Sequence, residues 1–514
     1  MEWIRRNIMC SSGGEFIELG NLRCEPTVQQ MKEMLWKKDS DGNFIDFGDF
    51  EINAQQKVEL DSKYGACNPD MGGKNNEKSI KLRKKGNTLV CPLKALDCYN
   101  HSLRLAENES KHVALAYSNR AACFYEMGFY DEASEDISRV REAQLPEHLQ
   151  TKLKLLSSDV KVGQSKHAPF EPKPHKNRMN LSYVQNKNYP CLADVVKIKE
   201  SEKYGRYLRS KYKLKANDMI LIEKDYLRTV DDLNGGIRTC TTCFAEDKNF
   251  IACPQCTDAM FCDENCRRES PIHSWECNTF ITTIEFDLKL PIHSVLMAFD
   301  LFTCNDKIDT KALINHVKQM LKTMDKLPES THDSTSKYEF FFKMSKCTVS
   351  EKLISYKLKS HEAVYVIEKL LLKIPKIAEA FQNRRDRVFL MHLILHHCLI
   401  IKTNGFGSAH SSKLGLVQSL FNHSCQFNTA HISIQNESFY WIKKKVKRND
   451  QLYISYVNVN LPTELRKRRL ETWGFVCSCN LCAPNSQNKC LKKINAILYR
   501  FDDDDDNDDY NNVE

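Results

Sequence analysis

The chain has 514 residues, of which 41% are apolar and 28% charged, so it can form three or four domains with sizeable cores and is not disordered as a whole. No apolar run reaches the roughly 18 residues of a membrane helix, and the N-terminus has no apolar signal region, so we expect neither a membrane nor a secreted protein. The net charge is +8, yet Asp502–Asp509 holds seven Asp, and the remainder is near +15. A basic body can bind nucleic acid or acidic proteins, although each basic run alone, 443–448 or 466–469, is typical of a solvated surface.

The first 162 residues carry mainly helical signals. Residues 1–78 are hard to interpret, apart from a helical spacing of apolar residues between Val28 and Leu35. From Ser79 to Val162 the pattern is helical and roughly repeated, with small residues where paired helices approach and large ones next to them. This pattern resembles the tetratricopeptide repeat (TPR), whose packing positions correspond to Ala121, Phe124, Ala133 and Ile137. An array this short should pack on the rest of the protein.

The rest of the chain mixes strand and helix patterns. A Pro-containing linker covers residues 163–188. Beyond the central cysteines the chain turns helical: Asp309 is an expected N-cap, and residues 386–401, apolar almost all round, predict a buried helix. Strand patterns lie at 195–198, 219–223, 430–434 and 452–456. The sequence therefore predicts an α+β protein with helical insertions.

Half of the 22 cysteines belong to two constellations, and clustered cysteines in a reducing compartment are usually metal ligands. The first constellation has the spacing C-x2-C-x9-C-x2-C-x5-C-x3-C-x6-H-x3-C. Its eight donors fill two closed tetrahedral zinc sites, and such metals must supply the folding energy of so short a segment. These donors are Cys240, Cys243, Cys253, Cys256, Cys262, Cys266, His273 and Cys277.

The order of these donors resembles that of a MYND finger. The resemblance implies interleaved sites, in which one structural zinc takes Cys240, Cys243, Cys262 and Cys266 and the other takes Cys253, Cys256, His273 and Cys277. MYND fingers usually bind proline-rich peptides, so such a peptide is an expected partner.

The second constellation joins three separate motifs. Asn422-His423-Ser424-Cys425 is followed by a strand that ends in Tyr456, and then by a C-x-C-x2-C motif with Cys477, Cys479 and Cys482. Three thiolates are one short of a tetrahedral site. The residues alone leave Cys425 and Cys490 as candidates for the fourth ligand.

Asn-His-Ser-Cys, Ile-Ser-Tyr and C-x-C-x2-C in this order resemble a SET domain with its post-SET element. With the finger inserted and helices in front, residues 79–485 resemble the SET- and MYND-domain lysine methyltransferases, in the subgroup with an N-terminal TPR-like region. The resemblance implies a SET-type β fold split by the finger and by a helical insertion. It also implies Cys425 as the fourth ligand, and hence three structural zinc ions.

The implied activity is transfer of a methyl group from S-adenosylmethionine to a lysine of a protein substrate. By the same resemblance Tyr456 is catalytic, because its hydroxyl would position the lysine amine at the channel mouth. The expected cofactor-binding residues are Tyr204, Gly205, Arg206, Asn422, His423, Tyr456 and Phe475. The chain departs from the family at Tyr207, where a second glycine is usual, and at residues 448–451, where Gly-Glu-Glu usually opens the strand.

The sequence predicts the following division: an N-terminal segment 1–78, TPR-like repeats 79–162, a linker 163–188, the first part of the SET domain 189–239, the finger 240–277, the helical insertion 278–401, the SET core 402–460, the post-SET element 461–490 and a disordered acidic tail 501–514. A rival interpretation is an inactive scaffold that binds proteins through the finger and the TPR-like helices. Sequence-specific DNA binding is not favoured, because the finger lacks the C-x2–4-C…H-x3–5-H form with a base-reading helix. The expected compartments are the cytoplasm and the nucleus.

Overall fold

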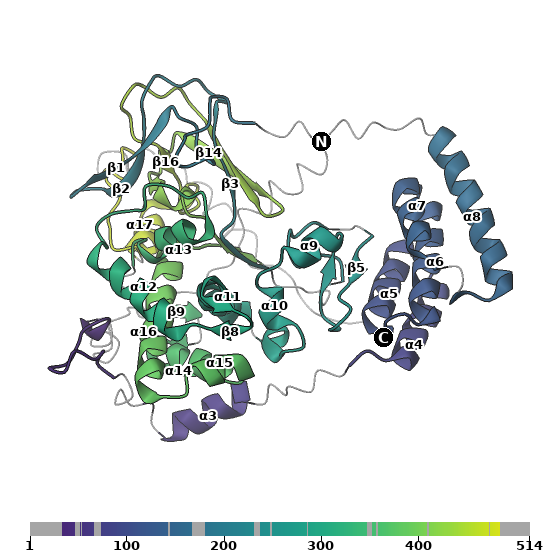
Figure 1. Ribbon diagram of the computed structural model, residues 1–514. Coiled ribbons are helices and arrows are strands. Elements are labelled where there is room, and N and C mark those ends of the chain that lie inside the picture. The colour runs from purple at the N-terminus through teal and green to yellow at the C-terminus, as the bar shows by residue number, and fades with distance from the viewer. Residues whose placement is uncertain are drawn as a thin grey trace, which may run out of the picture.

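The structure, a computed structural model, describes residues 33–46, 52, 54–65, 73–141, 144–166, 180–230, 237–246, 249–284, 286–346, 352–355, 358–408, 411–471 and 473–483. Cys490, the acidic tail and most of the linker lie outside the described residues, as does much of the N-terminal segment. Helices and small sheets alternate in the described part, so the α+β class is confirmed. A helical array lies on one side of the molecule, the sheets lie on the other, and the finger lies between them (Figure 1). None of the described helices is long and apolar enough to cross a membrane.

The helical array, as predicted, occupies the N-terminal part of the chain. It consists of α4 (Asn76–Asn87), α5 (Pro92–Leu105), α6 (Lys111–Glu126), α7 (Tyr130–Arg139) and α8 (Glu147–Lys166). Two glycines let neighbouring helices approach closely: a Cβ on Gly86 would lie 2.6 Å from the Tyr99 ring, and one on Gly163 would lie 2.5 Å from the Tyr130 ring. Ala121 and Ala133 are fully buried between the helices.

The array packs against the finger and against the residues that lead into it, as expected for so short a helical unit. Asn100 on α5 donates from Nδ2 to the carbonyl oxygen of Ile237 at 2.8 Å. Arg238 donates two hydrogen bonds, of 2.6 and 2.7 Å, to the carboxylate of Asp97. Polar contacts of this kind fix the orientation of two surfaces more than they add stability.

The sheets join strands that are remote in sequence. The β1–β2 hairpin is local, whereas β3 pairs with β15, β4 pairs with β12, and β13 runs parallel to β16. The strands are β1 (Val196–Ser201), β2 (Gly205–Ser210), β3 (Met219–Lys224), β4 (Leu227–Val230), β11 (Phe406–Ser408), β12 (Ser411–Leu414), β13 (Asn422–His423), β14 (Thr429–Ile434), β15 (Glu437–Ile442) and β16 (Tyr453–Ile454). The short β5 (Ile251–Ala252) and β6 (Met260–Phe261) form a hairpin in the finger.

A helical insertion supplies most of the core beneath these sheets. Its helices are α11 (Phe286–Leu301), α12 (Thr310–Lys322), α13 (Ser334–Phe342), α14 (Ser360–Leu371), α15 (Pro375–Ala380) and α16 (Arg384–Asn404), with α17 (Thr463–Glu471) following the last strand. The Asp309 N-cap is confirmed, because its carboxylate accepts a hydrogen bond from the Ala312 amide at 2.8 Å. The predicted buried helix is α16, which is buried from Val388 to Ile400.

A short segment before the array, residues 33–46, docks on α16 through two buried histidines. Trp36 donates from its backbone nitrogen to His392 Nδ1 at 3.1 Å and from its indole to His396 Nδ1 at 2.9 Å. Both imidazoles accept at Nδ1, so each carries its proton on Nε2, which faces the carbonyl oxygen of Ile45 or Phe342. This docking requires neutral histidines. No motif in the sequence predicts it.

Candidate functional site

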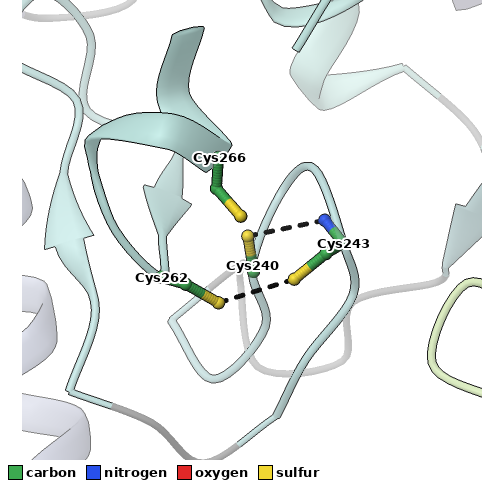
Figure 2. A group of neighbouring side chains, drawn as sticks. All are labelled: Cys240, Cys243, Cys262 and Cys266. Atoms are coloured by element: carbon green, nitrogen blue, oxygen red, sulfur yellow. Dashed lines mark hydrogen bonds between the residues drawn. The ribbon is translucent and has the colours of Figure 1, made fainter. Parts of the chain in front are cut away.

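The finger holds the first two groups of metal-ligating side chains. Cys240, Cys243, Cys262 and Cys266 form one group, drawn in Figure 2, and Cys253, Cys256, His273 and Cys277 form the other. In each group the donor atoms all lie within 4.8 Å of one another. Hairpin β5–β6 and the short helices α9 (Glu264–Arg268) and α10 (His273–Glu276) carry the later ligands of both groups. The structure thus interleaves the two sets as the sequence predicted.

The post-SET motif forms a third group with Cys425. The thiols of Cys425, Cys477, Cys479 and Cys482 come together, and Cys425 Sγ lies 3.6 Å from Cys482 Sγ. Arg466 on α17 donates from Nη2 to Cys482 Sγ at 3.6 Å, which brings a positive charge to the thiols. The structure therefore supplies Cys425 as a fourth donor, while Cys490 lies outside the described residues.

The geometry of all three groups fits zinc. Tetrahedral ligands at about 2.3 Å from zinc lie about 3.8 Å apart. The sulfur atoms of Cys243 and Cys262 are 3.5 Å apart, and those of Cys253 and Cys277 are 3.8 Å apart. Hydrogen bonds from Cys243 and Cys262 lower the pKa of Cys240, while the same crowding raises the pKa of Cys262. Thiols this close can all ionise only around a cation, and zinc is the usual one for such donors.

A cavity of about 160 Å³ lies where the sheets meet the helical insertion. Six of the seven predicted cofactor-binding residues line it: Tyr204, Gly205, Arg206, Asn422, Tyr456 and Phe475. They come from the β1–β2 turn, β13, the end of β16 and the segment after α17. Gly205 has φ +59°, a left-handed conformation that favours glycine at this turn. The cavity thus unites residues that are up to 271 positions apart in the sequence.

Hydrogen bonds fix the polar groups of this cavity. Asn422 donates from Nδ2 to the carbonyl oxygen of Tyr204 at 2.9 Å, which ties β13 to the β1–β2 turn. The hydroxyl of Tyr456 donates to the carbonyl oxygen of Phe421 at 2.6 Å. Burial raises the pKa of Tyr456 well above its ordinary value, so the hydroxyl stays protonated at neutral pH. Tyr456 therefore presents a neutral phenol to the cavity.

His423 lies behind the cavity wall rather than in it. Its Nδ1 accepts a hydrogen bond from the Tyr456 amide at 2.9 Å, and its Nε2 lies 3.4 Å from Cys425 Sγ. Burial is the main cause that lowers the pKa of His423 to about 4, with a smaller contribution from Arg466. The side chain links the third cysteine group to the backbone of Tyr456 and does not line the cavity, and cofactor binding by His423 stays a prediction.

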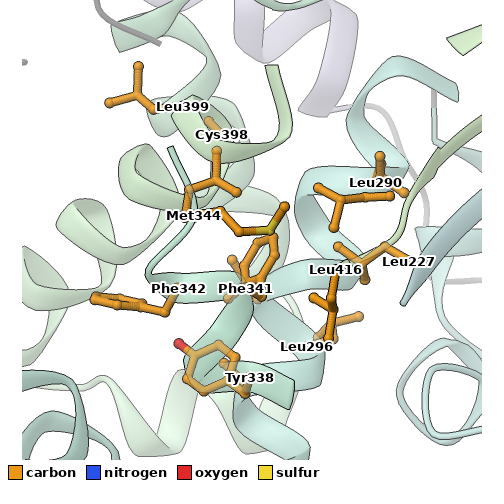
Figure 3. Packing of buried hydrophobic residues seen from close by; sticks show 14 of the residues in the cluster. Leu227, Leu290, Leu296, Tyr338, Phe341, Phe342, Met344, Cys398, Leu399 and Leu416 are labelled. Carbon is orange, nitrogen blue, oxygen red and sulfur yellow. The ribbon is translucent and has the colours of Figure 1, made fainter. Parts of the chain in front are cut away.

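The helical insertion forms a second wall of the cavity, and no motif in the sequence predicts it. Its contributions are Leu327, Met344, Ser345, Thr403 and Asn404, and Ser419, Leu420 and Trp473 complete the lining. Asn404 Nδ2 donates to the carbonyl oxygen of Ser345 at 2.7 Å, and Arg206 Nη2 donates to that of Met324 at 3.0 Å. Met344 follows Phe341 and Phe342, which lie in the core (Figure 3). The only hint of this wall in the sequence is the change from apolar to polar residues at Thr403 and Asn404, after the apolar stretch of α16.

Glu223 on β3 is a second residue that the motifs did not reveal. Its carboxylate accepts hydrogen bonds from three consecutive amides, those of Leu416, Val417 and Gln418, at 2.7–3.0 Å. This turn leads directly to Asn422. Burial raises the pKa of Glu223 to about 7, although the amide hydrogen bonds act in the opposite direction. Glu223 therefore shapes the turn before Asn422 from outside the cavity.

Known proteins resemble this chain in both parts of the SET and MYND architecture. A family model described as the MYND finger matches residues 240–277. The protein-lysine N-methyltransferase SMYD4 of Danio rerio is 25% identical over 40% of this chain and 30% of its own length. A SET and MYND domain-containing protein of Dictyostelium discoideum is 26% identical over 56% of this chain and 61% of its own length. The N-lysine methyltransferase SMYD2 of Rattus norvegicus is 22% identical over 50% of this chain and 53% of its own.

These matches show that the chain is similar to SET- and MYND-domain proteins and that residues 240–277 match the MYND finger. The chain spans less than two thirds of each of these relatives. A solved structure, the SET domain of LSMT bound to lysine and AdoHcy, covers 60% of this chain and 58% of its own with 13% identity and a TM-score of 0.28, which is too low to bear on function.

Proposed function

We propose that this protein transfers a methyl group from S-adenosylmethionine to a lysine side chain of a protein substrate. The observation that supports it most is the cavity itself, in which Tyr456, Asn422 and the Gly205 turn converge although they come from distant segments. Relatives named as lysine methyltransferases support the same chemistry. Which lysine is methylated depends on surfaces beyond the cavity.

The side chains of the cavity would divide the work. S-adenosylmethionine, when bound, supplies the electrophilic methyl group of its sulfonium. Asn422 and the Gly205 turn would hold the cofactor, and Phe475 and Trp473 offer aromatic faces to its adenine and cover it from water. Tyr456 would accept a hydrogen bond from the neutral lysine amine and align its lone pair, since its own proton points to the Phe421 carbonyl. The amine must lose its proton before attack.

We propose that each of the three cysteine groups binds one structural zinc ion. Every group is a closed set of four donors, so no coordination position is left for catalysis. Zinc in the third group would join Cys425, just after β13, to the cysteines that follow Phe475, and so would hold these two parts of the cavity wall together. All described cysteines are free thiols, which fits the reducing cytoplasm and nucleus that we propose as compartments.

We further propose that the array and the finger bind partner proteins. A groove of about 580 Å³ lies between them. Val113 and Tyr117 on α6 form one side, and Ile251 and Pro254 of the finger form the other. We propose that the finger side of this groove binds a proline-rich peptide and that the side formed by the TPR-like helices binds a partner protein. Such partners would add to the set of substrates that the protein can reach.

The test compares three variants by calorimetry with S-adenosylmethionine and by methyl transfer to a protein substrate. Tyr456→Phe should bind the cofactor within about threefold of wild type and transfer methyl groups about 10²–10⁴-fold more slowly. Asn422→Ala should weaken cofactor binding about tenfold, because one good hydrogen bond is lost. Tyr453→Phe is the matched control on the same strand, since its hydroxyl bonds Gln451 and does not line the cavity.

Methyl transfer by Tyr456→Phe at the wild-type rate would show that Tyr456 is not catalytic. A wild-type protein that binds no S-adenosylmethionine would instead identify the chain as an inactive scaffold, the rival interpretation.

A further inference from the structure

A strongly basic surface covers the β1–β2 hairpin, the segment 211–215 that follows it, and the segment 443–448 that pairs with residues 211–215. We call it the basic ridge. Its residues are Lys197, Lys199, Arg209, Lys211, Lys213, Lys215, Lys443, Lys444, Lys445, Lys447 and Arg448. Figure 1 shows β1 and β2 on the side of the molecule away from the array. None of these residues belongs to the cavity or to a cysteine group.

Strand pairing brings these cations together from two parts of the chain. Lys197 lies opposite Arg209 in the β1–β2 ladder. Leu214 and Val446 exchange backbone hydrogen bonds of 3.0 and 3.1 Å, and both are buried. Because this bridge is antiparallel, Lys213 lies beside Lys447 and Lys215 beside Lys445, on the exposed sides of the pair. The fold thus sets like charges opposite one another along the ridge.

Within the described residues, acidic side chains offset only part of this charge, since Asp218 and Asp450 accept hydrogen bonds from the backbone amides of Lys215 and Lys447 rather than from their ammonium groups. Among the ridge residues only Lys211 forms an ion pair, with Asp194 at 2.9 Å. Desolvation and the charges of Lys199, Arg209, Lys211 and Arg448 lower the pKa of Lys197. Like charges directly opposite in a sheet are destabilising. A fold that keeps several such pairs uncompensated has a surface suited to an anionic ligand.

Aromatic side chains accompany the cations. Tyr212, between Lys211 and Lys213, is 59% exposed. The ammonium of Lys443 lies 4.1 Å from the centre of the Phe427 ring. Alternation of cations with exposed aromatic rings is the combination that binds single-stranded nucleic acids, since the cations follow the phosphates and the rings stack on bases.

We propose that the basic ridge binds single-stranded nucleic acid, without sequence specificity, through its phosphate backbone. An acidic protein segment would use the cations but would leave the exposed ring of Tyr212 without a stacking partner. A duplex offers phosphates but hides its base faces. This inference does not depend on the methyl-transfer activity, and it agrees with the expectation that the finger does not read DNA sequence.

The experiment measures binding of the full chain to a fluorescent single-stranded 20-mer, to the matching duplex and to polyglutamate, at several salt concentrations. Lys213→Glu/Lys215→Glu should bind the single strand at least tenfold more weakly, and the slope of log affinity against log salt should fall by about two. The same variant places Glu opposite Lys445 and Lys447, so its melting temperature should not decrease. Lys81→Glu/Lys84→Glu on α4 is the control with equal charge change and should bind within twofold of wild type.

Lys197→Ala/Arg448→Ala provides a second, independent reduction of charge on the same ridge, and it should also weaken binding with a smaller salt slope. Equal loss of affinity in the α4 control would show that net charge alone determines binding and would overturn the proposal. Tighter binding of the duplex or of polyglutamate than of the single strand would also overturn it.

Discussion

The helical array is held together by contacts between neighbours in the sequence, whereas the SET region is held together by contacts between remote segments. In the array each helix packs on the next one in the chain, so α4 to α8 form a unit of local contacts. In the SET region β4 pairs with β12 and β13 pairs with β16, and the finger and the helical insertion lie between the partners of the first pair. Damage to the array should therefore stay local, whereas damage to the SET region should spread to the cavity.

Loss of a metal ligand should have the largest effect. A structural zinc contributes roughly 10–16 kcal/mol of apparent folding free energy, so Cys253→Ser should unfold the finger and release one zinc. Elemental analysis should return about three zinc ions per chain for wild type and two for the variant. The exposed Cys304, outside the three groups, is the control for a Cys→Ser change. Three ions retained in Cys253→Ser would contradict the assignment of that ligand.

A buried ion pair tests whether damage to the array stays local. Arg120 and Asp136 have fully buried side chains and lie 2.6 Å apart. Asp136→Ala leaves the guanidinium unpaired and should destabilise the array by about 3–5 kcal/mol. Calorimetric scans should show an earlier transition for the array with unchanged S-adenosylmethionine binding. Asp131→Ala, on the exposed side of α7, is the control, and a parallel loss of cofactor binding would show that the two regions are coupled.

The docking of residues 33–46 on α16 should be sensitive to acid. Burial lowers the pKa of His392 to about 4 from the ordinary 6.5, so the folded state disfavours the protonated form. The contribution to stability is present above pH 6.5 and is lost as the pH falls toward 4, by up to about 3 kcal/mol. His392→Gln, which cannot titrate, should flatten the unfolding free energy between these pH values relative to wild type. Identical pH profiles would disprove the role of His392.

The smallest effect concerns the contact between the array and the finger. Arg238 and Asp97 are 32% and 24% exposed, so Arg238→Ala should cost about 1 kcal/mol or less. Hydrogen exchange should rise in α5 and hardly change in β3. Faster exchange in β3 would mean that this contact also supports the SET region, against the distinction drawn above.

The features that could be predicted from the sequence are those that local spacing carries. The finger ligands recur at short fixed intervals, Asp309 precedes an amphipathic stretch, and residues 386–401 are apolar almost all round. The docking of Trp36 on His392 joins residues 356 positions apart, with no motif at either end. The Ser345–Asn404 wall likewise depends on how two helices cross. Such contacts follow from tertiary packing, which periodicity does not encode.

The remote pairing of the sheets also has a consequence for synthesis of the chain. β3 ends at Lys224, and its partner β15 begins at Glu437, about 210 residues later. A ribosome adds roughly 5–20 residues per second, so the partner strand is made about 10–40 s after β3. The array is complete by Lys166, long before that time, and its helix–helix contacts are all local, so they can begin to form as it emerges. β3 meanwhile lacks its partner, and an unpaired apolar strand edge is a template for pairing with other chains until Glu437–Ile442 has been translated.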